Sequence, residues 1–182
     1  MVNPRTFLPP RSLPAAPALR PGDRAPALPL ALDDDRPTIV AFLRHAGCPF
    51  AELTVQRMRD GAASWPEAQW IAISHAPTDA TERWCRAVGG AGGVRVASDP
   101  SRRAYADWGL GRTTLGHFLG GRSLAAVGRL ARQGIRNRHP YGNRWQSAGT
   151  FALDDRAIVR WRHLPAHAGD VPDLDMAMQA LR

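Results

Sequence analysis

The chain has 182 residues, a length that suits one domain with a full hydrophobic core. Hydrophobic residues make up 44% of it and charged residues 22%, which is typical of a globular protein and excludes wholesale disorder. The sequence contains no apolar run long enough to cross a membrane, and its proline-rich N-terminus lacks the pattern of a secretory signal. With only two cysteines, Cys48 and Cys85, we expect a reducing, cytoplasmic compartment and no disulfide framework.

The positive charge of the chain is concentrated in one segment. All 24 basic residues are arginines, and the formal net charge is +8. Residues 101–148 contain nine arginines and one acid, Asp107, so the rest of the chain is neutral. Such a basic patch can attract an anionic substrate, an acidic partner or nucleic acid, although no aromatic platform for nucleic acid accompanies it. A solvated helix face explains the patch equally well.

The first half of the chain predicts alternating strands and helices. Six prolines in the first 22 residues predict an extended arm, with the domain beginning at residue 23. Residues 27–32 are predicted to form a short edge strand, limited by its prolines. Apolar, β-branched runs predict buried strands over 38–43, 70–74 and 94–97. Capping residues and prolines predict helices over 49–63, 77–88 and from 101 through Trp108.

The second half begins with a less regular insertion, residues 111–147. Apolar residues at helical spacing, with arginines between them, predict one basic amphipathic helix within it. A hairpin is expected from strands 150–153 and 158–162, and a last helix over 172–181. This order predicts an α/β fold, a three-layer sandwich in which helices flank a central mixed β-sheet and which carries a basic helical insertion.

Cys48 is the strongest candidate for a chemical role. It follows the strand at 38–43 and begins the helix at 49, at the edge of the sheet where open α/β proteins place their sites. The helix dipole and the free backbone N–H groups there favour a thiolate. Arg44 and His45 are expected to add positive charge or a hydrogen bond. The plainer alternative is that Cys48 is a small buried apolar residue.

The stretch TIVAFLRHAGCPFAEL resembles the active-site segment of peroxiredoxin-like proteins of the AhpC/TSA redoxin branch. Further similar stretches follow in the family's order: Pro21–Pro26 before it, and Asp99-Pro100-Ser101 and the segment from Gln146 to Pro172 after it. The resemblance implies a thioredoxin-like domain over residues 23–182. It also implies that Cys48 attacks a peroxide and is then reduced by an external thiol. No cofactor is expected.

Departures from the family pattern leave three functions open. Ala51 replaces the second cysteine of a Cys-Pro-x-Cys motif, which predicts a one-cysteine peroxide or organic hydroperoxide reductase. His45 replaces the usual Thr or Ser, and Ala148 the usual arginine, so Arg44 would supply the charge. One alternative is a tailoring enzyme of a biosynthetic pathway that acts on a small organic anion. Another is a noncatalytic module that binds through the basic face 101–148. A homodimer stays open.

Three further residues are predicted to bind substrate: His75, Arg144 and Gln146. His75 follows a strand end and is expected to border the Cys48 cleft. Arg144 and Gln146 fit either a pocket wall or the edge of the core. Cys85 lies in the middle of a helix, where packing explains it better than a role as a resolving thiol. The six histidines have no metal-binding spacing, so no metal site is predicted.

Overall fold

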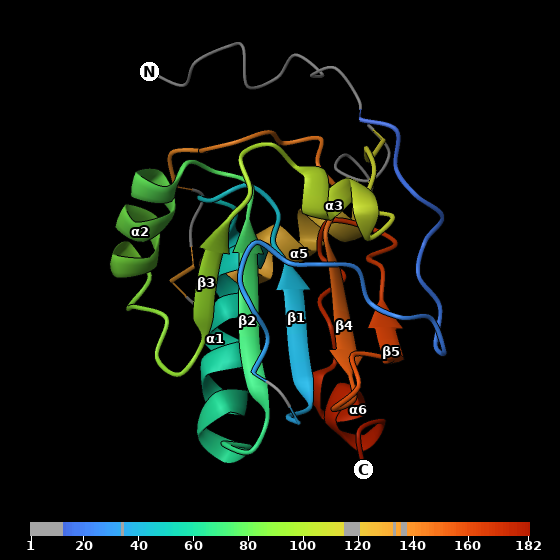
Figure 1. The fold of residues 1–182 in the computed structure, drawn as a ribbon. Helices are drawn as coiled ribbons and strands as arrows, with labels where there is room; N and C mark the ends of the chain where they lie inside the picture. Colours follow the sequence, from blue (N-terminus) through green and yellow to red (C-terminus); the bar gives the residue numbers. More distant parts are fainter. Residues whose placement is uncertain (1–12, 34, 115–120, 133, 136–137) are drawn as a thin grey trace.

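A mixed five-stranded sheet forms the centre of the molecule (Figure 1). The computed structural model describes residues 13–33, 35–114, 121–132, 134, 135 and 138–182. The strand order is β3-β2-β1-β4-β5, with the first three strands parallel and β4 and β5 antiparallel to their neighbours. The strands are β1 (Thr38–Phe42), β2 (Gln69–Ser74), β3 (Arg95–Ser98), β4 (Gly149–Leu153) and β5 (Val159–His163). The helices are α1 (Pro49–Ser64), α2 (Thr78–Ala87), α3 (Arg103–Asp107), α5 (Gly121–Arg132) and α6 (Leu174–Gln179).

The two faces of the sheet are covered in different ways. Successive side chains of a strand point to opposite faces, so Ile39 and Ala41 of β1 enter one core cluster and Val40 and Phe42 the other. The first cluster packs the sheet against α1, α2, α5 and α6. On the second face lie α3 and an extended stretch of the N-terminal segment. Burial on both faces explains why the central strands are uniformly apolar. The predicted α/β sandwich around a mixed sheet is confirmed.

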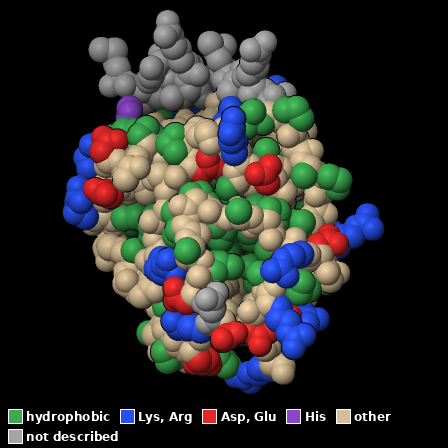
Figure 2. Space-filling model, viewed as in Figure 1, with side chains coloured by type: hydrophobic (Ala, Val, Ile, Leu, Met, Phe, Trp, Pro, Cys, Tyr) green, Lys and Arg blue, Asp and Glu red, His purple; other side chains and the backbone are tan. Residues whose placement is uncertain are grey.

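The prediction of an edge strand over residues 27–32 is wrong. This stretch has no strand pairing, because Pro26 and Pro29 lack the N–H groups that a ladder requires. Three of its leucines pack instead against the second core cluster: Leu28, Leu30 and Leu32. Figure 2 shows this face of the molecule, where hydrophobic side chains gather in the centre and charged side chains lie around them. The extended segment therefore works as a covering layer in place of a second set of long helices.

Part of the predicted N-terminal arm lies on the domain, and residues 1–12 lie outside the described part. The Ala16 N–H donates to the Ala106 carbonyl (2.9 Å). The Gly22 N–H donates to the Val159 carbonyl of β5 (2.8 Å), and Val159 in turn donates to the Asp23 carbonyl (2.9 Å). These bonds cover the start of the edge strand β5.

The predicted basic insertion contains α5 and an irregular stretch that follows it. Within residues 111–147, positions 115–120, 133 and 136–137 lie outside the described part, as do the side chains of Leu124 and Val127. Ala126 and Leu130 are buried against the first cluster, whereas Arg129 and Arg132 are exposed. Arg136 and the side chain of Arg122 are not described. The predicted helix is therefore present, and of its predicted apolar positions Leu130 is buried, whereas Ala131 is exposed.

Candidate functional site

Cys48 lies at the start of α1, directly after the turn that follows β1. Its backbone is extended (φ −75°, ψ 129°), and Pro49 occupies the first helical position, where no N–H is needed. The Cys48 N–H donates to the His45 carbonyl (3.0 Å), and the Cys48 carbonyl accepts from Glu52 (3.1 Å). Gly47 makes this tight turn possible with a φ of +94°. The cysteine is only 3% exposed, so the fold shields the thiol from bulk solvent.

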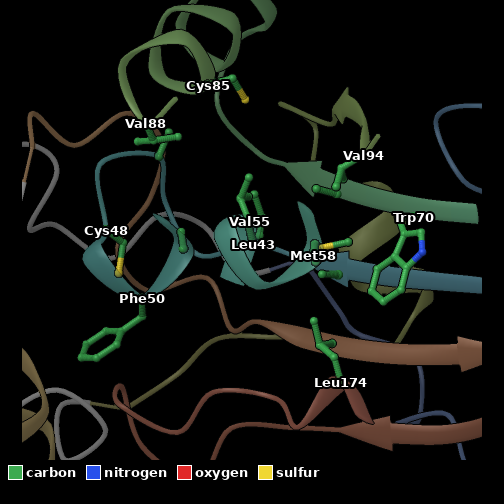
Figure 3. Packing of buried hydrophobic residues seen from close by; sticks show 14 of the residues in the cluster. Leu43, Cys48, Phe50, Val55, Met58, Trp70, Cys85, Val88, Val94 and Leu174 are labelled. Carbon is green, nitrogen blue, oxygen red and sulfur yellow. The ribbon is translucent and has the colours of Figure 1, made fainter. Parts of the chain in front are cut away.

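Arg44 is buried beside this turn. It is 7% exposed, and its Nη1 donates to the Ala168 carbonyl at 3.4 Å. Its guanidinium lies 6.0 Å from the centre of the Phe50 ring. Figure 3 shows the Cys48 and Phe50 side chains extending toward the same side of the first turn of α1, whereas Cys85 extends from α2. Both cysteines are free thiols.

His45 is a neutral group in this cluster. Its Nδ1 lies 3.2 Å from the Ala46 carbonyl oxygen, and the residue is 5% exposed. Burial lowers the pKa of His45 to about 3, and the positive charge of Arg44 acts in the same direction. The imidazole therefore stays uncharged at neutral pH. It can offer a hydrogen bond, but not the positive charge that the sequence left open.

Arg144 is brought to the cysteine from far along the chain. Burial lowers the pKa of its guanidinium, the Cys48 side chain acts in the opposite direction, and Arg44 repels it. Arg144 thus interacts electrostatically with both Cys48 and Arg44. Two guanidinium groups thus share the surroundings of one thiol, and positive charge there can stabilise negative charge that develops on a substrate.

His75 and Gln146 have other surroundings. His75 follows β2, is 4% exposed, and its Nε2 accepts from the Asn143 N–H at 2.9 Å. Burial lowers the pKa of His75 to about 4. Gln146 Nε2 donates to the Leu110 (2.7 Å) and Gly111 (3.1 Å) carbonyls. Its amide thus holds two chain segments together beside a different small cavity, of about 20 Å³.

Residues 138–146, which we call the strap, lie across the Cys48 turn. The Arg138 N–H donates to the Gly47 carbonyl (3.0 Å), and the Tyr141 N–H donates to the Ala46 carbonyl (2.9 Å). Arg138 Nε also donates to the carboxylate of Glu52 in the first turn of α1 (3.2 Å). The contact is so close that a Cβ on Gly47 would lie 2.4 Å from the His139 carbonyl oxygen. The strap therefore helps to bury the cysteine.

Sequence reasoning missed Glu52, Arg138 and the anchoring role of the strap. Arg138 is one of nine arginines in its segment, and nothing in its spacing distinguishes it from the others. Glu52 carried a weak signal, because an acidic side chain in the first helical turn is usually explained by the helix dipole. An acidic residue one helical turn after the candidate nucleophile is the sequence feature that could have indicated Glu52.

A small cavity lies at the carboxyl end of β1, beside Arg44 and Phe50. Its volume is about 30 Å³, which is room for about two water-sized molecules. Its other walls come from α1, from the start of β4 and from residues 165–172, and they are mostly apolar. The cavity therefore admits a small molecule next to the first turn of α1 and no large one.

Among the residues that the structure describes, no group of three His, Cys, Asp or Glu side chains is arranged to hold a metal ion. No helix among the same residues is both long and apolar enough to cross a bilayer.

Comparisons with solved structures find the same fold in redox proteins. A peroxiredoxin-like protein from Aquifex aeolicus aligns over 91% of this chain and 88% of its own, with 17% identity and a TM-score of 0.64. A thiol peroxidase from Chromobacterium violaceum covers 92% and 89%, with 17% identity and a TM-score of 0.61. A putative thiol:disulfide interchange protein DsbE from Chlorobium tepidum covers 90% and 98%, with 15% identity and a TM-score of 0.56. At these identities the likeness establishes the thioredoxin-like fold.

The family is shown by sequence. A comparison with curated proteins gives no match. The sequence model of the AhpC/TSA antioxidant enzymes matches residues 56–167, more than half of the chain, beginning after Cys48. This match and the peroxiredoxin-like fold support a thiol-dependent redox function. The chain belongs to the AhpC/TSA antioxidant enzyme family and is a peroxiredoxin-like protein with a thioredoxin-like fold.

Proposed function

We propose that the protein is a one-cysteine reductase of hydrogen peroxide or small organic hydroperoxides, with Cys48 as the nucleophile. The observation that carries the proposal is the place of Cys48 at the start of α1, directly after the turn that holds the buried Arg44 side chain. Arg144, which is partly buried, adds a second positive charge within electrostatic range of Cys48. Positive charge at this point favours the thiolate, which is the form of cysteine that attacks a peroxide.

The reaction transfers two electrons from sulfur to the peroxide. The Cys48 thiolate attacks one peroxide oxygen, the O–O bond breaks, and the sulfur becomes a sulfenic acid. The leaving oxygen takes up a proton and departs as water or an alcohol. Arg144 and Arg44 stabilise the negative charge that moves from sulfur to this oxygen. His45 is neutral and contributes hydrogen bonding only.

Reduction of the sulfenic acid needs a thiol from outside the chain. An external thiol attacks the Cys48 sulfur, releases water and forms a mixed disulfide. A second thiol then frees Cys48 and leaves as a disulfide. Cys85 extends from a different helix (Figure 3), and burial raises the pKa of its thiol, which disfavours the attacking thiolate. In this proposal the enzyme works in the cytoplasm, with an external thiol reductant.

The size of the cavity supports a small substrate over the organic anion of a tailoring reaction. About 30 Å³ beside Arg44 is room for a molecule the size of hydrogen peroxide. A larger substrate would require the walls of this cavity, among them residues 165–172, to move. A noncatalytic binding module would need no ionised cysteine, so that function does not explain why positive charge lies near Cys48.

Stopped-flow kinetics with hydrogen peroxide and tert-butyl hydroperoxide test the proposal. We expect Cys48→Ser to slow peroxide consumption by at least about a hundredfold, because the hydroxyl is a far weaker nucleophile. Cys85→Ser is the matched control and should keep the wild-type rate. A sulfenic acid trapped by dimedone should map to Cys48 by mass spectrometry. Equal, very slow rates in the wild type and in Cys48→Ser would contradict the proposal.

A further inference from the structure

The strap has no helix or long strand of its own, although it carries Arg144. Its ladder contacts are two isolated bridges, Tyr141 with Ala46 and Gln146 with Arg112. The position of the Arg144 guanidinium therefore depends on the points at which the strap is attached. Two of them, at Arg138 and Tyr141, hold it to the turn before Cys48. A third attachment lies directly beside Arg144.

This third attachment is the imidazole of His75. The N–H of Asn143, the residue before Arg144, donates to His75 Nε2 at 2.9 Å. The Asn143 side-chain oxygen accepts from the Trp145 N–H at 2.7 Å, which closes the turn around Arg144. Gly142 lies against the same ring, since a Cβ there would be 2.7 Å from His75 Cδ2. His75 thus contacts the strap at the two residues that precede the arginine.

His75 is itself held firmly to the sheet. It follows β2, and its ring stands edge-on to Tyr105, with 5.4 Å between ring centres. The Tyr105 hydroxyl lies 2.7 Å from the Leu43 carbonyl oxygen and 2.8 Å from that of Ile73, at the ends of β1 and β2. Cys48 follows the same end of β1. These contacts therefore connect the strap to the carboxyl ends of β1 and β2, and Cys48 lies just beyond the end of β1.

Both ring nitrogens of His75 have partners within the protein. His75 Nε2 lies 2.9 Å from the Asn143 nitrogen and 3.0 Å from the Asn143 carbonyl oxygen, and Nδ1 lies 3.5 Å from the Tyr105 hydroxyl oxygen. Burial lowers the pKa of His75 to about 4, which keeps the ring neutral at physiological pH. A direct substrate contact by His75, as expected from the sequence, would require one of these bonds to break.

We infer that His75 is a positioning residue: it holds the strap and thereby fixes where the Arg144 guanidinium lies relative to the Cys48 turn. The inference rests on the proposed pairing of Arg144 with Cys48. It assigns His75 no contact with the peroxide. Removal of the imidazole acceptor frees the Asn143 N–H, loosens the strap around Arg144 and withdraws the positive charge from the sulfur.

The test compares alkylation of Cys48 by iodoacetate and by iodoacetamide, in a Cys85→Ser background at low ionic strength. The two reagents are similar in size but differ by one negative charge. Their rate ratio therefore reports the positive charge at the thiol, while changes in access affect both rates alike. We expect Arg144→Gln to lower the iodoacetate-to-iodoacetamide ratio about fivefold, the scale of one nearby charge that is partly screened by solvent.

His75→Phe should lower the ratio by a similar factor, and the double variant should lower it no further. His75→Gln should keep most of the ratio, because its amide oxygen can still accept from Asn143. His139→Phe is the control, since it makes the same replacement at an exposed ring in the same strap. Gly142→Ala is a second variant: its Cβ would clash with the His75 ring and displace the strap, while the imidazole itself stays unchanged. It should also lower the ratio.

Two results would overturn the inference. One is an unchanged ratio in both His75→Phe and Gly142→Ala while Arg144→Gln lowers it. The other is a fall of both alkylation rates by the same factor in His75→Phe, which would mean a general loss of structure. The ratio needs no peroxide turnover, so a failure of the peroxidase proposal appears separately, in the kinetics of Cys48→Ser.

Discussion

At the scale of single residues, the Cys48 turn depends on one glycine. Gly47 has a φ of +94°, and the strap carbonyl of His139 occupies the space where a side chain would begin. A left-handed conformation costs a residue with a Cβ about 1–2 kcal/mol, and overpacking of a rigid backbone about 1–3 kcal/mol more. The glycine therefore serves both the turn and the close approach of the strap.

We predict that Gly47→Ala lowers the free energy of unfolding by about 3 kcal/mol. Gly90→Ala is the matched control, because Gly90 has a similar φ of +82° with open space around it. Gly90→Ala should lower the free energy of unfolding by only about 1 kcal/mol, because it adds the strain of a left-handed backbone but no clash with a neighbour. Urea unfolding of the three proteins measures both values. Equal losses in the two variants would mean that the strap does not press on Gly47.

At the scale of elements, two helix glycines have opposite environments. Gly61 of α1 packs against the indole of Trp70, with only 2.4 Å from a hypothetical Cβ to Cη2. Gly128 of α5 has open space around it. Helix propensity alone favours alanine over glycine by about 1 kcal/mol at both places. Packing against β2 thus decides which of the two glycines the fold requires.

We therefore expect Gly128→Ala to raise the free energy of unfolding by about 0.5–1 kcal/mol. Gly61→Ala should lower it by about 1 kcal/mol or more, because displacing Trp70 costs more than the gain in propensity. Thermal and urea unfolding of the pair give the comparison. Stabilisation by both substitutions would show that α1 can shift away from Trp70 at little cost.

At the scale of the whole molecule, the two buried histidines make stability depend on pH. Burial lowers the pKa of His45 to about 3 and that of His75 to about 4, from an ordinary 6.5. Between pH 4 and pH 6.5 the two histidines of the unfolded chain bind up to about two protons that the folded protein does not bind. The stability is fully present above pH 6.5, and it falls as the pH falls toward 4, because protonation favours the unfolded chain.

Two protons correspond to a loss of about 2.7 kcal/mol per pH unit in the middle of this range. We predict this slope for the free energy of unfolding between about pH 6 and pH 5, measured by urea denaturation. His75→Gln should reduce it to about half, since one titrating group remains. A stability that stays constant over this range would show that neither histidine is neutral and buried as described.

The site and the fold differ in how far local sequence could predict them. The sheet strands, the helix at Pro49 and the place of Cys48 follow from apolar runs, proline and glycine, which act within a few residues. The same signals located Arg44 and His45 beside the cysteine. They fail for residues 27–32, where the prolines do not merely limit the predicted strand but prevent its pairing.

The sequence by itself determined the alternation of strands and helices and the place of Cys48 between a strand and a helix, because side-chain periodicity and helix capping are local properties. Only the tertiary structure decided that Arg144 comes within electrostatic range of Cys48, that Glu52 pairs with Arg138, and that His75 accepts a hydrogen bond from the strap. These contacts join residues 68 to 96 positions apart. The strap binds largely through backbone N–H and carbonyl groups, which every residue carries, so residue identity alone could not select the partners.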